Sequence, residues 1–163
     1  MGSGKDSAAN FLAAKYKGDR VAFSDPIYDI MHFAQRRCGI PRSKDRQFLQ
    51  FVGTEWARAK DPDVWVTSLL RRTAYCTRPI FLSDIRYPNE LRALQDNGWV
   101  CVKLFGRRDV LRSGTGDSHH VSETSVDTIP TSCWDLVLDN SGTLDDFYTQ
   151  LDNVNWSMLS LRP

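Results

Sequence analysis

The sequence has little of what marks several large classes of protein. It has four cysteines, none of them spaced as C-x-x-C, so it indicates neither a zinc site nor a disulfide framework. It contains no apolar run long enough to cross a bilayer and no recognisable signal peptide. Its formal net charge is only +1, which gives no overall argument for nucleic-acid binding. We therefore expect a cytoplasmic protein with reduced thiols that binds neither a membrane nor, directly, a nucleic acid.

Nothing divides the chain into parts. No internal repeat, linker or low-complexity segment is visible, and 163 residues are enough to bury one sizeable core. The most loop-like interior stretch is 113–118, which is rich in Gly and Ser. We expect a single domain over residues 1–163, with a short lid and acceptor segment at about 106–125.

The N-terminus, Met1-Gly2-Ser3-Gly4-Lys5-Asp6-Ser7, is typical of the second half of a phosphate-binding loop. Gly2 and Gly4 let the backbone approach an anion closely, because they have no Cβ. N–H groups of the loop and of the following helix then face the phosphates. Lys5 is placed to reach the outer phosphates of a nucleotide, and Ser7 to offer a hydroxyl to Mg²⁺. The first glycine of the full pattern, and the strand that feeds such a loop, would lie upstream of Met1.

A second interpretation of these residues stays open. A Gly- and Ser-rich N-terminus can be frayed and bind nothing. Against this stands the abrupt change to helix-forming residues at Asp6, which a disordered tail would not need.

Helical and strand patterns alternate along the rest of the chain. This alternation predicts an α/β layer fold with a mostly parallel sheet. The continuous apolar run Ile80-Phe81-Leu82 predicts a strand buried on both faces. The strands are expected at 20–24, 79–83, 99–105 and 134–138, and the helices at 6–17, from 25, from 43–45, at 64–75, at 88–97 and from 143.

Charged residues gather where the predicted strands end. Ligands of parallel sheets bind at these carboxyl ends, where Asp25, Asp84, Arg86 and Arg107 are found. A phosphate loop, an Asp and several Arg together are typical of a site for phosphoryl transfer. That reaction needs the phosphates held in line and their developing negative charge neutralised. Lys5, Asp84, Arg86 and Arg107 are the candidate catalytic residues, and Ser7 and Asp84 the candidate Mg²⁺ ligands.

Seven short motifs occur together in one order. They are Gly4-Lys5-Asp6-Ser7, Phe23-Ser24-Asp25-Pro26, Gly53-Thr54-Glu55, Asp61-Pro62-Asp63-Val64-Trp65-Val66, Asp84-Ile85-Arg86-Tyr87-Pro88-Asn89-Glu90, His120-Val121-Ser122-Glu123 and Asn140-Ser141-Gly142-Thr143-Leu144. As an ordered set they resemble the deoxynucleoside monophosphate (dNMP) kinases of tailed bacteriophages. The resemblance extends over nearly the whole chain, and the stretch from Asp84 to Glu90 is its most specific part.

The resemblance implies a three-layer α/β/α fold of the P-loop kinase type, whose first strand lies upstream of Met1 here. It implies transfer of the γ-phosphoryl group of ATP to a dNMP with Mg²⁺, in an infected bacterial cytoplasm, often as a dimer. The implied donor site comprises Gly2, Ser3, Gly4, Lys5, Asp6 and Ser7. The implied acceptor site comprises Asp25, Arg58, Trp65, Arg86 and Glu123.

Two other functions stay open. The chain could be another P-loop phosphotransferase, acting on a nucleoside or small metabolite, or a nucleotide-binding module that is catalytically impaired. The arginines on the acceptor side favour a substrate that already carries a phosphate. The sequence leaves the base of that substrate undetermined.

Overall fold

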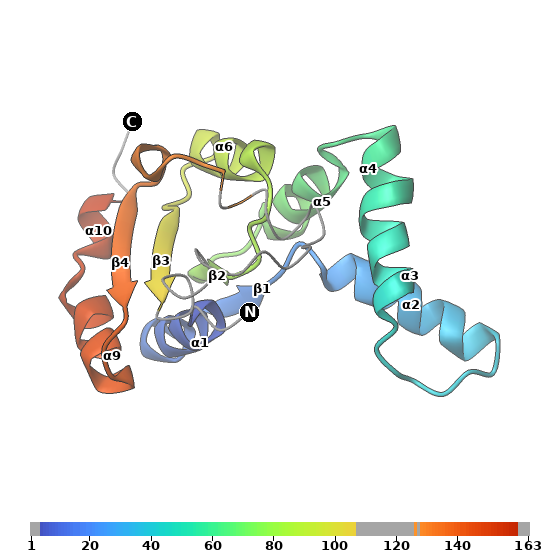
Figure 1. Ribbon diagram of the computed structural model, residues 1–163, viewed down its shortest axis with the longest axis horizontal. Coiled ribbons are helices and arrows are strands. Elements are labelled where there is room, and N and C mark those ends of the chain that lie inside the picture. The colour runs from blue at the N-terminus through green and yellow to red at the C-terminus, as the bar shows by residue number, and fades with distance from the viewer. Residues whose placement is uncertain (1–3, 107–125, 127, 160–163) are drawn as a thin grey trace, which may run out of the picture.

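The computed structural model describes residues 4–106, 126 and 128–159. Short parallel strands and many helices form a mixed α/β fold (Figure 1). Strand β1 (Asp19–Val21) pairs in parallel with β2 (Ile80–Leu82), and β3 (Val102–Gly106) pairs in parallel with β4 (Leu136–Asn140). Parallel strands need long crossover connections, and for the β1–β2 pair helices between residues 25 and 73 supply it. The alternation in the sequence thus correctly predicted a mixed α/β fold with parallel strands.

Local signals in the sequence place the helix ends. The Asp45 carboxylate accepts a hydrogen bond from the Phe48 N–H, which caps α3. Gly98, at φ 77°, ends α6 as a left-handed residue. The helices are α1 (Lys5–Tyr16), α2 (Asp25–Arg37), α3 (Arg46–Gln50), η1 (Phe51–Trp56, a π-helix), α4 (Ala57–Lys60), α5 (Val64–Thr73), α6 (Pro88–Asp96), η2 (Thr131–Cys133, a 3₁₀ helix), α9 (Leu144–Asn153) and α10 (Trp156–Leu159). Among the helices described, none is both long and apolar enough to cross a membrane.

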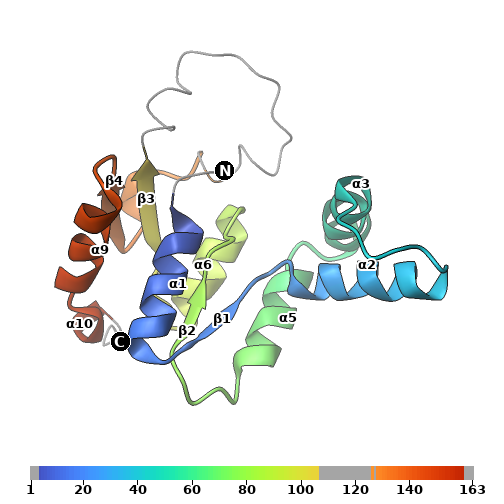
Figure 2. The same ribbon diagram turned by 90° about the horizontal axis from the view of Figure 1, so that it is seen from below.

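Helix α1 links the two pairs of strands. Figure 2 shows it between the β1–β2 pair and the β3–β4 pair. Its Ala8 and Leu12 share one apolar cluster with Phe81 of β2, Leu104 of β3 and Leu138 of β4. Helix α9 contributes buried side chains to the same cluster and packs directly against α1. The start of α1 is therefore held against both sheets by the packing of its buried face.

The expectation that β2 is buried on both faces is wrong for the described structure. Ile80, Phe81 and Leu82 are each only half-buried. Within the described residues β2 pairs only with β1, and β3 only with β4, so the two sheets stay separate. An apolar strand with a neighbour on one side only keeps part of its side chains exposed.

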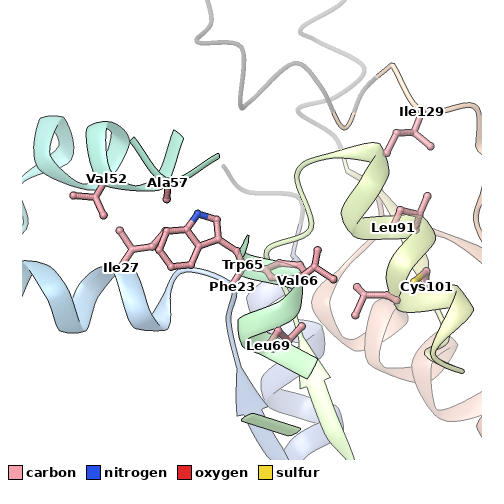
Figure 3. Close-up of a cluster of buried hydrophobic side chains, with 11 residues drawn as sticks. Phe23, Ile27, Val52, Ala57, Trp65, Val66, Leu69, Leu91, Cys101 and Ile129 are labelled. Carbon is pink, nitrogen blue, oxygen red and sulfur yellow. The ribbon is translucent and has the colours of Figure 1, made fainter. Parts of the chain in front are cut away.

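Helices α2, α3, η1 and α4 form an arm that extends away from the sheets (Figure 1). Trp65 of α5 attaches this arm to the body. The residue is 5% exposed, and Figure 3 shows its ring directed toward Ile27 of α2 and toward Val52 and Ala57. The π-helix in the arm was not predicted, because a single widened turn leaves the apolar periodicity of a helix almost unchanged.

Candidate functional site

The start of α1 carries the described part of the predicted phosphate loop. Gly4 precedes the helix with φ 85°, a left-handed conformation that glycine adopts without strain. Lys5 and Asp6 are exposed and Ser7 is half-buried. The N–H groups of this first turn and the positive end of the helix dipole make an anion-binding position. Gly2 and Ser3 of the predicted loop lie outside the described residues.

Asp6 ties this helix start to the carboxyl end of β2. Its Oδ1 accepts a hydrogen bond of 2.8 Å from the hydroxyl of Ser83, the residue that follows β2. Arg20 of β1 donates to the same oxygen at 2.8 Å and to the Ser83 hydroxyl at 2.9 Å. The Ser83 hydrogen bond, followed by Arg20, lowers the pKa of Asp6. Asp6 thus makes these structural contacts as an ionised carboxylate, independently of any contact with a ligand.

Asp84 comes next after Ser83 and binds the turn between β1 and α2. Its Oδ1 accepts from the Phe23 N–H at 2.9 Å, and its Oδ2 accepts from the N–H and hydroxyl of Ser24 at 3.1 and 2.9 Å. A carboxylate offers about four acceptor positions, so three are used here. Asp84 therefore brings two strand ends together and keeps room for one further donor or ligand.

Asp25, a candidate acceptor residue, belongs to this same turn. Its Oδ2 accepts from the Ala22 N–H at 2.8 Å and from Arg72 of α5 at 3.2 Å. Arg72 also donates to the Ala22 carbonyl oxygen at 2.8 Å. The structure thus gives Asp25 a partner that the sequence did not reveal, because Arg72 lies 47 residues away in the chain.

Glu90 lies at the centre of the most specific sequence motif, although it was given no role from sequence. It is 1% exposed, its Oε1 is 2.5 Å from Arg58 and its Oε2 accepts from the N–H groups of Arg86 and Tyr87. Burial raises the pKa of Glu90, while Arg58 and these N–H groups oppose that shift. Its position three residues into a helix that begins at Pro88 was the available signal, since glutamate there often binds N–H groups before the helix.

Arg58 and Trp65, both candidate acceptor residues, meet at one backbone atom. Arg58 donates to the Gly53 carbonyl oxygen at 2.6 Å, and the Trp65 indole N–H donates to it at 2.8 Å. Gly53 lies in the π-helix, where the Ala57 N–H donates five residues back to Val52. The Arg58 guanidinium also stacks on the Tyr87 ring, 4.4 Å from its centroid. These contacts hold the Arg58 guanidinium between the π-helix and the residue that precedes α6.

Arg86 differs from its neighbours. Its side chain is exposed, and within the described part of the chain it makes no ion pair or side-chain hydrogen bond. Its backbone is held by Glu90, so the guanidinium projects from a fixed anchor. Two other predicted residues, Arg107 and Glu123, lie outside the described residues.

Only two residues, Ser7 and Asp84, are predicted to bind Mg²⁺. Among the described residues no group of three or more His, Cys, Asp or Glu side chains could hold a metal ion. Mg²⁺ in phosphoryl-transfer sites needs no such cage, because it takes one or two protein oxygens together with substrate phosphates and water. Ser7, half-buried in the first turn of α1, and the remaining acceptor position of Asp84 stay the predicted protein ligands.

Sequence comparisons relate the chain to viral proteins. No model of a known protein family matches it. It is 32% identical over 132 residues to "Uncharacterized protein ORF77" of Ictalurid herpesvirus 1 (strain Auburn), covering 78% of this chain and 56% of that protein. It is 24% identical over 182 residues to a "Putative deoxynucleotide monophosphate kinase" of Acanthamoeba polyphaga mimivirus, covering 92% of this chain and 89% of that protein. The chain thus spans little more than half the length of the herpesvirus relative.

The second similarity extends over most of both chains, so this chain is similar along most of its length to a protein named as a putative deoxynucleotide monophosphate kinase. Neither relative is named as a bacteriophage protein, so that origin stays a prediction.

Proposed function

We propose that this protein is a nucleotide kinase that transfers the γ-phosphoryl group of ATP to a deoxynucleoside 5′-monophosphate. In the reaction the bond between the γ-phosphorus and the β–γ bridging oxygen breaks, and a phosphate oxygen of the dNMP forms the new bond. The products are ADP and a dNDP. No proton abstraction is required, because the acceptor phosphate is already largely ionised at neutral pH.

One observation carries the proposal: the start of α1 lies at the carboxyl ends of strands from both sheets. Asp6 is bonded to Ser83 after β2, and Gly4 lies against Asn140 at the end of β4. Parallel sheets bind ligands at these ends, and a helix N-terminus there favours a phosphate. Lys5, in the first turn, would neutralise the outer phosphates of ATP during transfer.

The acceptor phosphate would meet Arg86. A planar guanidinium binds a phosphate through two parallel hydrogen bonds, and this one has no ion-pair partner in the described structure. Glu90 anchors its backbone at 2.7 Å, which limits the loss of freedom on binding. Arg58, Trp65 and Asp25 would shape the acceptor side through the contacts given above, together with Glu123, while Arg107 would act at the transferring group.

The Ser7 hydroxyl and the Asp84 carboxylate would hold Mg²⁺, directly or through water, and the ion would supply positive charge that neutralises the phosphates of ATP during transfer.

The finer fold that we propose is the three-layer arrangement of P-loop kinases. In it one more parallel strand pairs with β2 and β3 and leads into the phosphate loop. The support is that these two apolar strands are half-buried and each is paired on one side only within the described residues. A crystal structure with β2 and β3 hydrogen-bonded to each other would refute this arrangement. A homodimer, cytoplasmic action and the absence of nucleic-acid binding stay predictions.

The experiment is a coupled assay of ADP formation with ATP, Mg²⁺ and each of the four common dNMPs. The Lys5→Ala variant should lose about 10²–10³-fold in kcat, as happens when one donor to transition-state charge is removed. Its melting temperature should stay close to that of the parent, because Lys5 is exposed. Lys60→Ala, which removes an exposed lysine at the end of α4, is the matched control and should keep full activity.

Full activity of Lys5→Ala would refute the phosphate-loop assignment. Absence of turnover with every dNMP in a folded protein would refute the dNMP kinase. If ATP binding then persisted, the protein would be a nucleotide-binding module; turnover with a nucleoside would make it another kind of phosphotransferase.

A further inference from the structure

Asn140 lies so close to Gly4 that a residue with a side chain at position 4 would collide with it. A Cβ built on Gly4 would lie 2.2 Å from Nδ2 of Asn140 and 3.3 Å from its Cγ. The side-chain amide of Asn140 therefore lies directly against the backbone of the residue that precedes α1. Gly4 has φ 85°, so its conformation at this contact is the left-handed one.

The pairing of β4 with β3 and hydrogen bonds around the end of β4 hold Asn140 in place. It is the last residue of β4 and stands opposite Gly106 in the register with β3. The loop after it is closed by short-range hydrogen bonds: the Ser141 N–H and hydroxyl each donate to Asp139 at 2.8 Å. Gln150 of α9 donates to the Asp139 carbonyl oxygen at 2.8 Å. The end of β4 therefore cannot move without breaking several hydrogen bonds.

We propose that Asn140 is a positioning residue that holds Gly4, and with it the first turn of α1, in the conformation that binds phosphate. The proposal rests on the proposed function for its consequence, but the contact itself can be tested without a nucleotide. Because Gly4 directs the N–H groups that follow it, a shift of the loop would weaken ATP binding more than it would slow the transfer. Asn140 itself would touch no reacting atom.

The first test is hydrogen exchange measured by mass spectrometry on the ligand-free protein. Asn140→Ala should speed exchange in the peptide covering residues 4–12 by roughly tenfold, as expected when a local opening becomes easier. Exchange in α9 should stay unchanged. Ser141→Ala is the matched control, because it removes a hydrogen bond of the same loop without touching Gly4. If Asn140→Ala folds poorly, Asn140→Ser provides a smaller truncation of the same side chain.

A double-mutant cycle on unfolding gives a second, independent test. Gly4→Ala strains the left-handed backbone in any background, but it also collides with the Asn140 amide. Gly4→Ala should therefore lower the folding equilibrium constant about tenfold more in the parent than in the Asn140→Ala background. Equal effects in both backgrounds, or exchange in Asn140→Ala no faster than in Ser141→Ala, would overturn the proposal.

The functional consequence is measured as a split between KM and kcat. Asn140→Ala should raise the KM for ATP roughly tenfold and change kcat less than about twofold. Asn140→Asp, which keeps the shape of the side chain, should restore slow exchange at residues 4–12. If the parent has no kinase activity, the proposed function fails, while the exchange and unfolding results still decide whether Asn140 holds Gly4. An active parent with an unchanged KM in Asn140→Ala would refute the functional part alone.

Discussion

Removing Arg58 should destabilise the protein strongly at neutral pH and weakly in mild acid. Arg58 and Glu90 form an ion pair of 2.5 Å in which the side chains are 15% and 1% exposed. In Arg58→Met the carboxylate of Glu90 would stay buried without its cation, and breaking a buried pair in this way costs about 3–5 kcal/mol. With a urea m-value of about 2 kcal/mol/M, the unfolding midpoint should fall by about 2 M.

The pH dependence follows from the burial of Glu90. Burial already raises the pKa of Glu90 in the parent, and loss of Arg58 removes an interaction that opposes this rise. A carboxyl group with a raised folded-state pKa stabilises the fold below its unfolded value, about 4.3, and that stabilisation is lost as pH rises through the folded value. The free-energy cost of Arg58→Met should therefore be smaller near pH 5 than near pH 8.

Two further variants make the reasoning testable by urea unfolding at both pH values. Arg58→Met combined with Glu90→Gln should recover part of the loss, because Gln carries no charge and keeps an oxygen that accepts from the N–H groups of Arg86 and Tyr87. Lys15→Met is the control: it breaks the pair with Asp152, whose side chains are 37% and 47% exposed, and should cost less than about 1 kcal/mol. Equal costs of Arg58→Met at pH 5 and pH 8, or no recovery in the double variant, would refute the argument.

Two further predictions concern packing. Burial raises the pKa of Cys101 to about 12, so its thiol should not react with a maleimide in the native protein. The other three cysteines are exposed and should react quickly. Fast labelling of all four cysteines would contradict this prediction. Gly18→Ala should lower the free energy of unfolding by about 1–3 kcal/mol, because an added Cβ would lie 2.4 Å from the Pro79 carbonyl oxygen and 2.6 Å from the Phe81 ring. An unchanged thermal unfolding midpoint would contradict this prediction, since it would show that the neighbouring atoms move aside without cost.

The candidate site could be predicted from sequence only as a set of residue types. Gly4, Asp6 and Asp84 were named because a glycine before a helix and an aspartate after a strand have recognisable local patterns. Their partners were not, because the hydrogen bond from Ser83 to Asp6 joins residues 77 positions apart. The donor and acceptor roles of these residues stay predictions.

Burial was harder to predict than secondary structure. The apolar run in β2 indicated a strand correctly, but its exposure depends on how many strands lie beside it. Trp65 was named as a candidate acceptor residue, and its side chain is buried with its N–H hydrogen-bonded to the Gly53 carbonyl oxygen, while the acceptor role stays a prediction. An aromatic residue in a helix gives the same local signal whether it packs in a core or binds a ligand.

By itself the sequence determined several helix ends, because those signals act over a few residues, whereas the ends of the predicted strands differ from the observed ones by up to three residues. Asp45 caps α3 three residues on, and Gly98 ends α6 through its own φ angle. Only the tertiary structure decided that Glu90 would bury the charge of Arg58, 32 residues away, and that Asn140 would lie against Gly4. Such contacts depend on the path of the whole chain, since residues far apart meet only after the helices have packed on the strands.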